Sequence, residues 1–135
     1  EGRVKMTAED KAKKDFLEEK GKINQEKEKF IDILRDLEVD ENRLRAADPL
    51  IENAAFMSVA LKNLQNKIAE NGMISEYKNG PNQWGTKQSD EVKTYNTMIY
   101  RYNAIMKQVL QLIPEDKEED EDINIIEQFA NSRPD

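Results

Sequence analysis

The 135-residue sequence has no cysteine and no histidine. Without cysteine there is no disulfide, and no thiolate to act as a nucleophile or metal ligand. Without histidine the chain lacks the side chain that most often acts as a general base near neutral pH and binds metals. An enzyme would need a divalent metal held by carboxylates, and no set of Asp and Glu is spaced along one face of the helical hairpin predicted below. We expect a protein that is not an enzyme and uses no cofactor.

Long apolar runs are absent as well. No segment approaches the length of a membrane span, and the N-terminus lacks the apolar stretch of a signal peptide. We therefore expect no membrane partner. The first residues, Glu1-Gly2-Arg3, match the end of the protease-cleavable tag Ile-Glu-Gly-Arg. Residues 1–5 are interpreted as a tag remnant and Met6 as the native start.

The net charge of −7 is confined to the C-terminal part of the chain. Residues 1–113 carry 19 acidic and 19 basic side chains, whereas residues 114–135 carry 9 acidic and 2 basic ones. Residues 53–113 are mildly basic, with 7 basic against 4 acidic side chains. The overall acidity therefore does not exclude binding to nucleic acid, because the basic residues lie in another part of the chain.

Two stretches in the middle of the chain have the apolar spacing of helices that pack along their length. In each stretch, apolar residues recur at alternating intervals of three and four positions. The first contains Leu50, Ala54, Met57, Leu61, Leu64 and Ile68, and the second contains Val92, Tyr95, Ile99, Tyr102, Met106, Val109 and Ile113. We expect two long helices that fold back on each other as an antiparallel hairpin, joined by a loop around Trp84. The predicted class is all-α.

The ends of these two helices carry recognisable signals. Asp48 is expected to cap the first helix, with Pro49 at its first position, and Gly72 is expected to end it. Ser89 is expected to cap the second helix, because its hydroxyl can accept a hydrogen bond from the first turn. Pro114 is expected to end that helix. Residues 48–114 are therefore predicted to form the hairpin core.

Residues 73–89 are predicted to be a loop, in which the turn dipeptide Asn79-Gly80 allows a brief β-hairpin. Trp84 lies in this loop between glycine and proline residues. Its ring could stack on a nucleic-acid base or mark a contact between subunits. The favoured interpretation is that it covers apolar side chains at the end of the helical hairpin.

The N-terminal region, residues 6–47, is predicted to contain short helices. Thr7 is a good N-cap for a charged helix that Gly21 ends. Asn24 can cap a second helix, and residues 39–42 either end that helix or continue it into the next. In the first of these helices, Lys11, Lys13 and Lys14 alternate with acidic residues, which favours a solvated helix over a DNA-binding arm.

Residues 115–135 are predicted to form a tail. Its acidic run, residues 115–122, is expected to be disordered, and it lacks the alternating ligands and central glycine of a calcium loop, so no metal site is predicted. Beyond it, three apolar residues recur at helical spacing: Ile123, Ile126 and Phe129. So short a helix is not stable alone in water. We expect it to bind a partner or to dock on its own assembly.

The apolar stripes of the two long helices are wider than one seam requires. Beside the seam lie Ala55, Phe56, Val59 and Ala60 in the first helix and Met98, Ile105, Leu110 and Leu112 in the second. Such surfaces have to be covered by other apolar groups. The N-terminal helices can cover one part and neighbouring copies the rest. We expect a homo-oligomer, with a cyclic arrangement that gives every subunit the same contacts.

Several segments carry a resemblance to a known family. They are Asp48-Pro49, Asn71-Gly72, Tyr77-Lys78-Asn79-Gly80, Trp84-Gly85, Ser89-Asp90-Glu91-Val92-Lys93 and Leu110-Gln111-Leu112-Ile113-Pro114. Together they resemble the small subunit of a tailed-phage terminase, in the group whose helical-hairpin core ends Leu-x-Leu-x-Pro. The similarity covers residues 15–114. Many relatives have Gly, and Ser or Thr, where this chain has Gln111 and Ile113, and residues 7–47 show no clear helix-turn-helix.

The resemblance implies a non-catalytic protein that assembles as a ring and recognises the ends of viral double-stranded DNA. It also implies that the protein recruits and regulates the large terminase subunit during genome packaging, in the cytoplasm of a bacterial host. The tail would then bind the large terminase or the portal. The alternative is a non-enzymatic coiled-coil scaffold or adaptor that does not bind DNA.

The residues expected to contact DNA are basic residues of the hairpin. They are Lys93, Arg101, Lys107, Lys87, Lys78, Lys62 and Lys67. Lys93, Tyr100 and Lys107 are spaced by seven and therefore share a face of the second long helix, turned away from the seam. Such a face can contact phosphates without reading bases. Considered individually, a charged side chain of this kind is more often simply exposed to solvent than in contact with DNA.

Overall fold

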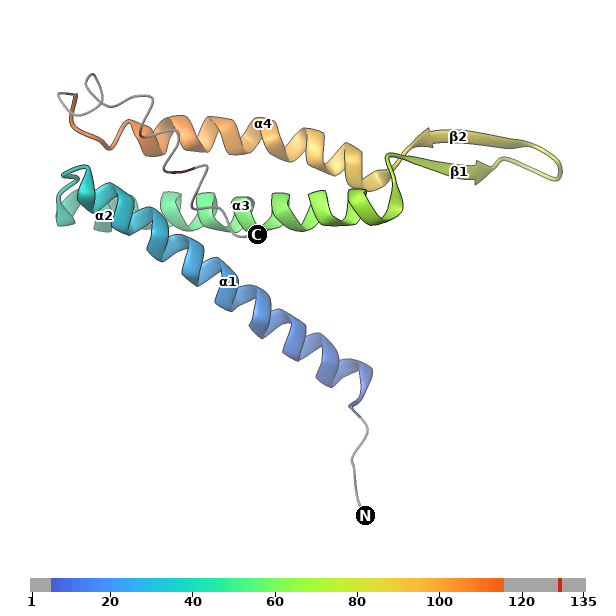
Figure 1. Ribbon diagram of the computed structural model, residues 1–135, viewed down its shortest axis with the longest axis horizontal. Helices are drawn as coiled ribbons and strands as arrows, with labels where there is room; N and C mark the ends of the chain where they lie inside the picture. The colour runs from blue at the N-terminus through green and yellow to red at the C-terminus, as the bar shows by residue number, and fades with distance from the viewer. Residues whose placement is uncertain (1–5, 116–128, 130–135) are drawn as a thin grey trace, which may run out of the picture.

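The structure, a computed structural model, describes residues 6–115 and Phe129 (Figure 1). In this part of the chain the elements follow in the order α1 (Ala8–Asp36), α2 (Glu41–Ala46), α3 (Asp48–Asn71), β1 (Ile74–Lys78), β2 (Trp84–Gln88) and α4 (Asp90–Leu110). The structure is 74% helical, which confirms the predicted helical class. A small two-stranded sheet is added to it.

The antiparallel pair of long helices is confirmed, and α3 is its central member (Figure 1). One side of α3 packs on α4 along the predicted seam, where Leu61 of α3 and Tyr102 of α4 are buried. α1 crosses the other side, and Ser58 Oγ donates a hydrogen bond to Glu26 Oε1 of α1 at 3.4 Å. Val59 lies beside Ser58 on this side and is also buried. The N-terminal region therefore covers part of the widened stripe, as the sequence led us to expect.

α1 is a single helix of 29 residues, so the prediction of two short helices in this region was wrong. Gly21 lies inside the helix, where a Cβ atom would meet nothing within 4 Å. A glycine at such a position costs about 1 kcal/mol relative to alanine. The capping box of Thr7 and Asp10 and the many Lys, Glu and Ala residues of α1 offset that cost. Asn24 is an exposed residue within the same helix.

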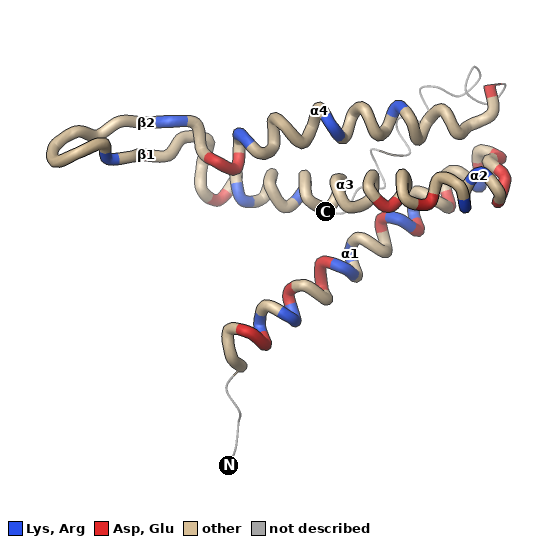
Figure 2. The backbone as a smooth tube through the Cα atoms, turned by 180° about the vertical axis from the view of Figure 1, so that it is seen from behind, with Lys and Arg blue, Asp and Glu red and all other residues tan. Residues whose placement is uncertain are grey.

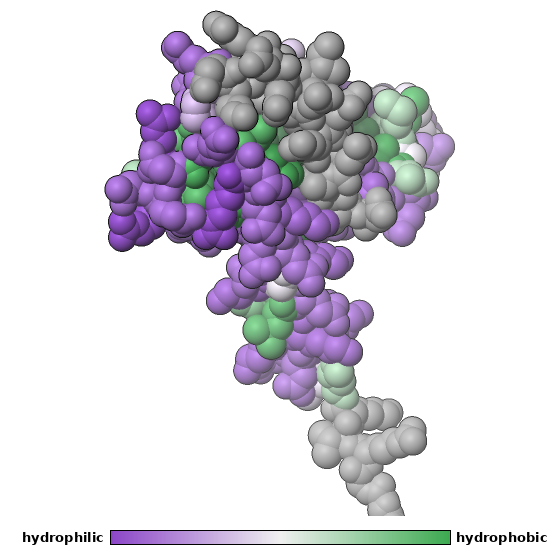
Figure 3. Space-filling view, turned by 60° about the vertical axis from the view of Figure 1, so that its left-hand side comes forward, coloured by the Kyte–Doolittle hydropathy of each residue, from purple (hydrophilic) through white to green (hydrophobic). Residues whose placement is uncertain are grey.

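Among the described residues, α1 packs on the rest of the molecule mainly through its C-terminal half. The buried residues of α1 are Glu26, Phe30 and Leu34, and the N-terminal half points away from the other helices (Figure 1). Basic and acidic residues alternate along this half (Figure 2). It also bears an apolar patch (Figure 3), which includes Phe16 and Leu17, 65% and 66% exposed. We refer to residues 8–22 as the projecting half of α1.

α1 ends in a sharp corner before α2. Glu38 has a φ of 68°, and the N–H groups of Glu38 and Val39 bond to carbonyls of the last turns of α1 at 2.9 and 3.0 Å. This is the usual way in which a left-handed residue ends a helix. Asp40 then caps α2 by accepting a hydrogen bond from the Arg43 N–H at 2.8 Å. Of the two alternatives for residues 39–42, the helix end is therefore the correct one.

The predicted end of α3 at Gly72 and the predicted cap of α4 at Ser89 are confirmed. Gly72 has a φ of 84°, which favours glycine. The predicted cap of α3 was wrong by one residue, because Ala47 holds the cap position and Asp48 is the first helical residue. The Asp48 carboxylate forms an ion pair with Lys27 of α1 at 2.9 Å instead, so it joins two helices.

α4 ends at Leu110, before the proline predicted to stop it. The N–H groups of Leu112 and Ile113 bond to carbonyls three residues back, at 3.1 and 3.2 Å. The chain after the helix therefore forms tight turns. Arg43 of α2 donates a hydrogen bond to the Leu112 carbonyl at 3.2 Å. α2 thus covers the C-terminal end of α4.

Residues 73–89 form the brief β-hairpin that Asn79-Gly80 allowed. β1 and β2 pair antiparallel along their full length, and the ribbon extends beyond the ends of α3 and α4 (Figure 1). Tyr77 lies over Gly85, where a Cβ atom would come within 2.7 Å of the ring. A larger residue at position 85 would push aside the Tyr77 ring, which is 43% exposed.

Trp84 does not cover the end of the helical hairpin, so the favoured interpretation of this residue was wrong. It opens β2 and is 68% exposed. Its partner across the ribbon is Lys78, whose ammonium lies 5.3 Å from the ring centre in a cation–π contact. Strand pairing holds the ring on a ribbon that extends away from the apolar seam. Base stacking and a subunit contact both stay predictions for this residue.

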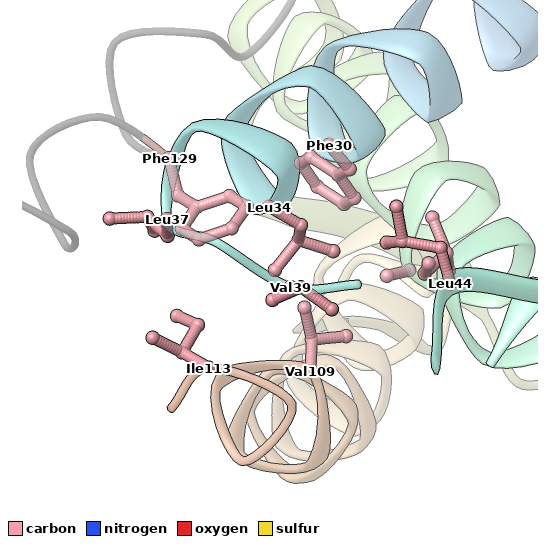
Figure 4. Close-up of a cluster of buried hydrophobic side chains, with 10 residues drawn as sticks. Phe30, Leu34, Leu37, Val39, Leu44, Val109, Ile113 and Phe129 are labelled. Carbon is pink, nitrogen blue, oxygen red and sulfur yellow. The ribbon is translucent and has the colours of Figure 1, made fainter. Parts of the chain in front are cut away.

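The main core lies at the end of the molecule opposite to the β-hairpin. The C-terminal half of α1, α2, the start of α3 and the end of α4 meet there (Figure 4). Its buried residues are Phe30, Leu34, Leu37, Val39, Leu44, Ile51, Ala54, Val109, Ile113 and Phe129. Ile105, Leu110 and Leu112, which widened the α4 stripe, pack against it. Phe56 of α3 remains exposed.

Candidate nucleic-acid interface

The outer face of α4 carries three of the basic residues predicted to contact DNA. Burial of Tyr102 against α3 fixes the rotation of the helix, and Lys93, Arg101 and Lys107 are exposed. No Asp or Glu occurs between Lys93 and Leu110. Lys93 and Lys107 are 14 positions apart, about 21 Å at roughly 1.5 Å per residue. The outer face of α4 is therefore positive over most of its length.

A shallow groove between α3 and α4 borders this face. Its volume is about 350 Å³, and it is lined by Met57 of α3 and by Lys93, Thr94, Thr97, Met98 and Arg101 of α4. The two methionines supply apolar surface, and the two cations give it a positive edge. The groove can hold an anionic group beside an apolar one. Its lining contains no carboxylate that could act as a catalytic base.

The two lysines of the β-hairpin do not extend the positive face of α4 as one surface. Lys78 pairs with Trp84, and Lys87 pairs with Ser75. Because side chains alternate along a strand, these two lysines lie on opposite faces of the ribbon. Lys87 also forms an ion pair with Asp90 at 3.7 Å, which partly neutralises it.

Lys62 and Lys67 lie on α3, and they too are separated from each other. Lys62 is half-buried and Lys67 is exposed. Five positions apart on a helix, they point to different sides. The seven predicted residues therefore comprise one group of three on α4 and four separate positions.

Phe129, predicted to bind a partner, belongs to the core of its own chain. Its ring is 5% exposed. The ring centre lies 5.2 Å from that of Phe30 at an interplanar angle of 80°, an edge-to-face arrangement (Figure 4). Ile123 and Ile126 lie outside the described residues. The tail was expected to bind a partner or to dock on its own assembly. Phe129 occupies a site on its own chain.

Sequence reasoning missed the polar contacts between α1 and α3. Glu26 is 1% exposed and accepts a hydrogen bond from Ser58, and Glu19 accepts one from Asn63 Nδ2 at 2.9 Å. A signal for this interface is present in the sequence as apolar residues of α1 and its C-cap spaced by seven: Phe16, Ile23, Phe30 and Leu37. Glu19 and Glu26 fall beside this series on the helix, so they face α3.

A surface ion pair fixes the corner between α1 and α2. Arg35 donates two hydrogen bonds to the Glu41 carboxylate, at 2.7 and 3.3 Å. This side-chain hydrogen bond lowers the pKa of Glu41 below its ordinary value and raises the pKa of Arg35. Both side chains are exposed, and each shift follows mainly from that one contact. We therefore assign the pair a role in the fold, not in chemistry.

Within residues 6–115 and Phe129, no group of three or more acidic residues is placed to hold a metal ion. No helix of this described part is both long and apolar enough to cross a membrane. Comparison of the chain with models of known families, with characterised proteins and with solved structures finds no match. A functional assignment therefore depends on the residues and geometry given above.

Proposed function

We propose that this protein is the small terminase subunit of a tailed phage. In this role it binds viral double-stranded DNA, assembles as a ring, and recruits and regulates the large terminase subunit in the host cytoplasm. The observation that carries the proposal is the outer face of α4, where Lys93, Arg101 and Lys107 are exposed and no acidic residue intervenes. The resemblance of residues 15–114 to such proteins agrees with it.

The chemistry of this face suits a DNA backbone. Duplex DNA carries about one negative charge per 1.7 Å of its axis, so cations spread over about 21 Å of helix meet many phosphates. Contacts of this kind position a protein on DNA without reading the sequence. Screening limits the reach of exposed charges to about 8 Å at physiological salt. The local charge of α4 therefore matters more for this contact than the net charge of −7 of the whole chain.

Assembly as a ring is supported by apolar surface that the single chain leaves uncovered. Met57 of α3 and Met98 of α4 line the open groove between these two helices. Contacts repeated by rotation would cover these groups identically in every subunit. Recruitment is assigned to residues 115–135, whose acidic side chains favour a basic surface on the large terminase or the portal.

The test is salt-dependent binding of a labelled DNA duplex, measured by fluorescence anisotropy. The parent protein should bind at low salt and weaken steeply as salt rises, because phosphate contacts release counterions. Replacement of Lys93, Arg101 and Lys107 by Glu should abolish binding and leave the helical circular dichroism signal intact. A matched control places the same charge change on α1, at the exposed residues Lys11, Lys14 and Lys29, and should keep binding.

The outcomes separate the possible explanations. If the α4 variant binds as well as the parent, the contacts lie elsewhere, and the basic residues of the N-terminal helices, Lys22, Lys27 and Arg43 among them, are next to be tested. If the parent itself shows no salt-dependent binding, the proposal fails. The second candidate, a coiled-coil scaffold or adaptor, is then favoured. The separation of Lys78 and Lys87 on opposite faces of the ribbon and the burial of Phe129 in its own core are consistent with that candidate.

A further inference from the structure

Most of the projecting half of α1 has no polar contact with another described helix. The hydrogen bond from Asn63 of α3 to Glu19 is the polar contact nearest its free end. In residues 8–18, the hydrogen bonds and ion pairs of the described side chains stay within α1 and its cap, as between Lys13 and Glu9 at 3.6 Å. A helix of about 12 residues is marginal in water without tertiary contacts. A partner that packs on this half would stabilise it.

An apolar groove opens where the projecting half leaves α3. It has a volume of about 440 Å³, and its apolar lining comes from Phe16 and Ile23 of α1 and Phe56 of α3. Glu19, Lys20 and Glu52 border it. Phe16 also lines a second hollow on α1 together with Leu17 and Ala12. The patch seen on this helix in Figure 3 is therefore more than a single exposed side chain.

This surface continues an interface that the chain already uses. Phe16 and Ile23 belong to the series spaced by seven whose later members, Phe30 and Leu37, are buried in the core. The same stripe of α1 is thus buried at one end and open at the other. A stripe of this kind is suited to packing against another helix.

The charge of the projecting half indicates what kind of partner it takes. Residues 8–22 contain five acidic and five basic side chains: Glu9, Asp10, Asp15, Glu18 and Glu19 against Lys11, Lys13, Lys14, Lys20 and Lys22. A segment without net charge has no net electrostatic attraction for nucleic acid or for an anionic lipid surface. A second segment of the same balanced composition can supply opposite charges to both kinds of side chain.

We propose that the projecting half of α1 packs against a second copy of this chain. Phe16 of each copy enters the groove formed by Phe56 and Ile23 of the other, so the contact is reciprocal and two-fold. This contact is separate from the proposed function, because a two-fold contact joins copies in pairs and cannot by itself close a ring. It covers the exposed aromatic rings and gives the projecting helix the tertiary support it lacks.

The first test is self-association of the full chain in sedimentation velocity experiments. Phe16→Ser should remove one association step. Because Phe16 is 65% exposed in the single chain, circular dichroism and thermal stability at high dilution should stay close to those of the parent. Tyr100→Ser, at an aromatic residue of α4 that is 79% exposed, is the matched control and should associate as the parent does. Unchanged association of the Phe16 variant would overturn the proposal.

The second test uses the absence of cysteine from the chain. A variant with Lys13→Cys, one turn before Phe16, is mixed with a differently tagged variant with Asn53→Cys at the groove, and both are treated with oxidised glutathione. A disulfide-linked mixed dimer is expected, because the two thiols lie on facing surfaces. Lys13→Cys mixed with Asn103→Cys, on α4, should give none. If the two mixtures cross-link equally, or if neither does, the proposed contact is excluded, whatever the outcome of the DNA-binding test.

Discussion

Phe129 offers the sharpest test of the core, because among the described residues it is the one beyond residue 115 that is buried there. Full burial of a phenylalanine side chain stabilises a fold by about 1.5–3 kcal/mol relative to leaving it exposed. Phe129 is 5% exposed, so its expected contribution is about 2–3 kcal/mol. Phe129→Ala should lower the free energy of unfolding by that amount.

Urea unfolding followed by circular dichroism measures this difference. The midpoint of Phe129→Ala should fall relative to the parent, while the slope stays nearly the same. Tyr100→Ala serves as the control, because Tyr100 is an exposed aromatic residue of α4. The double variant with Phe30→Ala should destabilise less than the sum of the two single variants, because the rings contact each other. If Phe129→Ala unfolds at the same urea concentration as Tyr100→Ala, the ring does not contribute to the core and the reasoning fails.

Three further predictions concern the helices. Gly21→Ala should raise the free energy of unfolding by about 0.5–1 kcal/mol in thermal melts, because Gly21 is helical with open space around its Cβ position. The pKa of Glu41 is lower in the folded chain than its ordinary value, so its pair with Arg35 stabilises the fold at neutral pH and is lost as the pH falls through the acid range. On acidification, the melting temperature of a Glu41→Gln variant should therefore fall less than that of the parent. Ile105→Asp places a charge on a helix face that packs against the core, and light scattering and circular dichroism should show dissociation or unfolding.

The helical hairpin could be predicted because the residues that specify it lie within the two helices and at their ends. The alternating spacing that includes Leu61 and Tyr102 specifies which faces meet, and Gly72 and Ser89 specify where the helices end. Predictions failed where a distant residue decides the outcome. Asp48 forms an ion pair with Lys27 of α1 instead of capping its own helix, and no local pattern indicates that pairing.

In the N-terminal region and the candidate site, too, predictions failed where residues elsewhere in the chain decide the outcome. A break at Gly21 is expected from its propensity, yet the rest of α1 continues the helix through it. Trp84 could be placed only once the pairing of β1 with β2 was known. The spacing of Phe129 indicates an amphipathic segment, but spacing alone cannot distinguish its own core from a partner. For the same reason, the lysines of the hairpin could be chosen by sequence but not assigned to one surface, since Lys78 and Lys87 lie on opposite faces of a ribbon.

The most direct test of the account is a native mass spectrum of the full chain, recorded with and without a short DNA duplex. A small terminase subunit should give one dominant assembly of more than two copies, and added DNA should shift that assembly by the mass of the duplex. The shift should disappear when Lys93, Arg101 and Lys107 are replaced by Glu. A spectrum of monomers that do not take up DNA at any protein concentration would contradict both the assembly and the DNA binding proposed here.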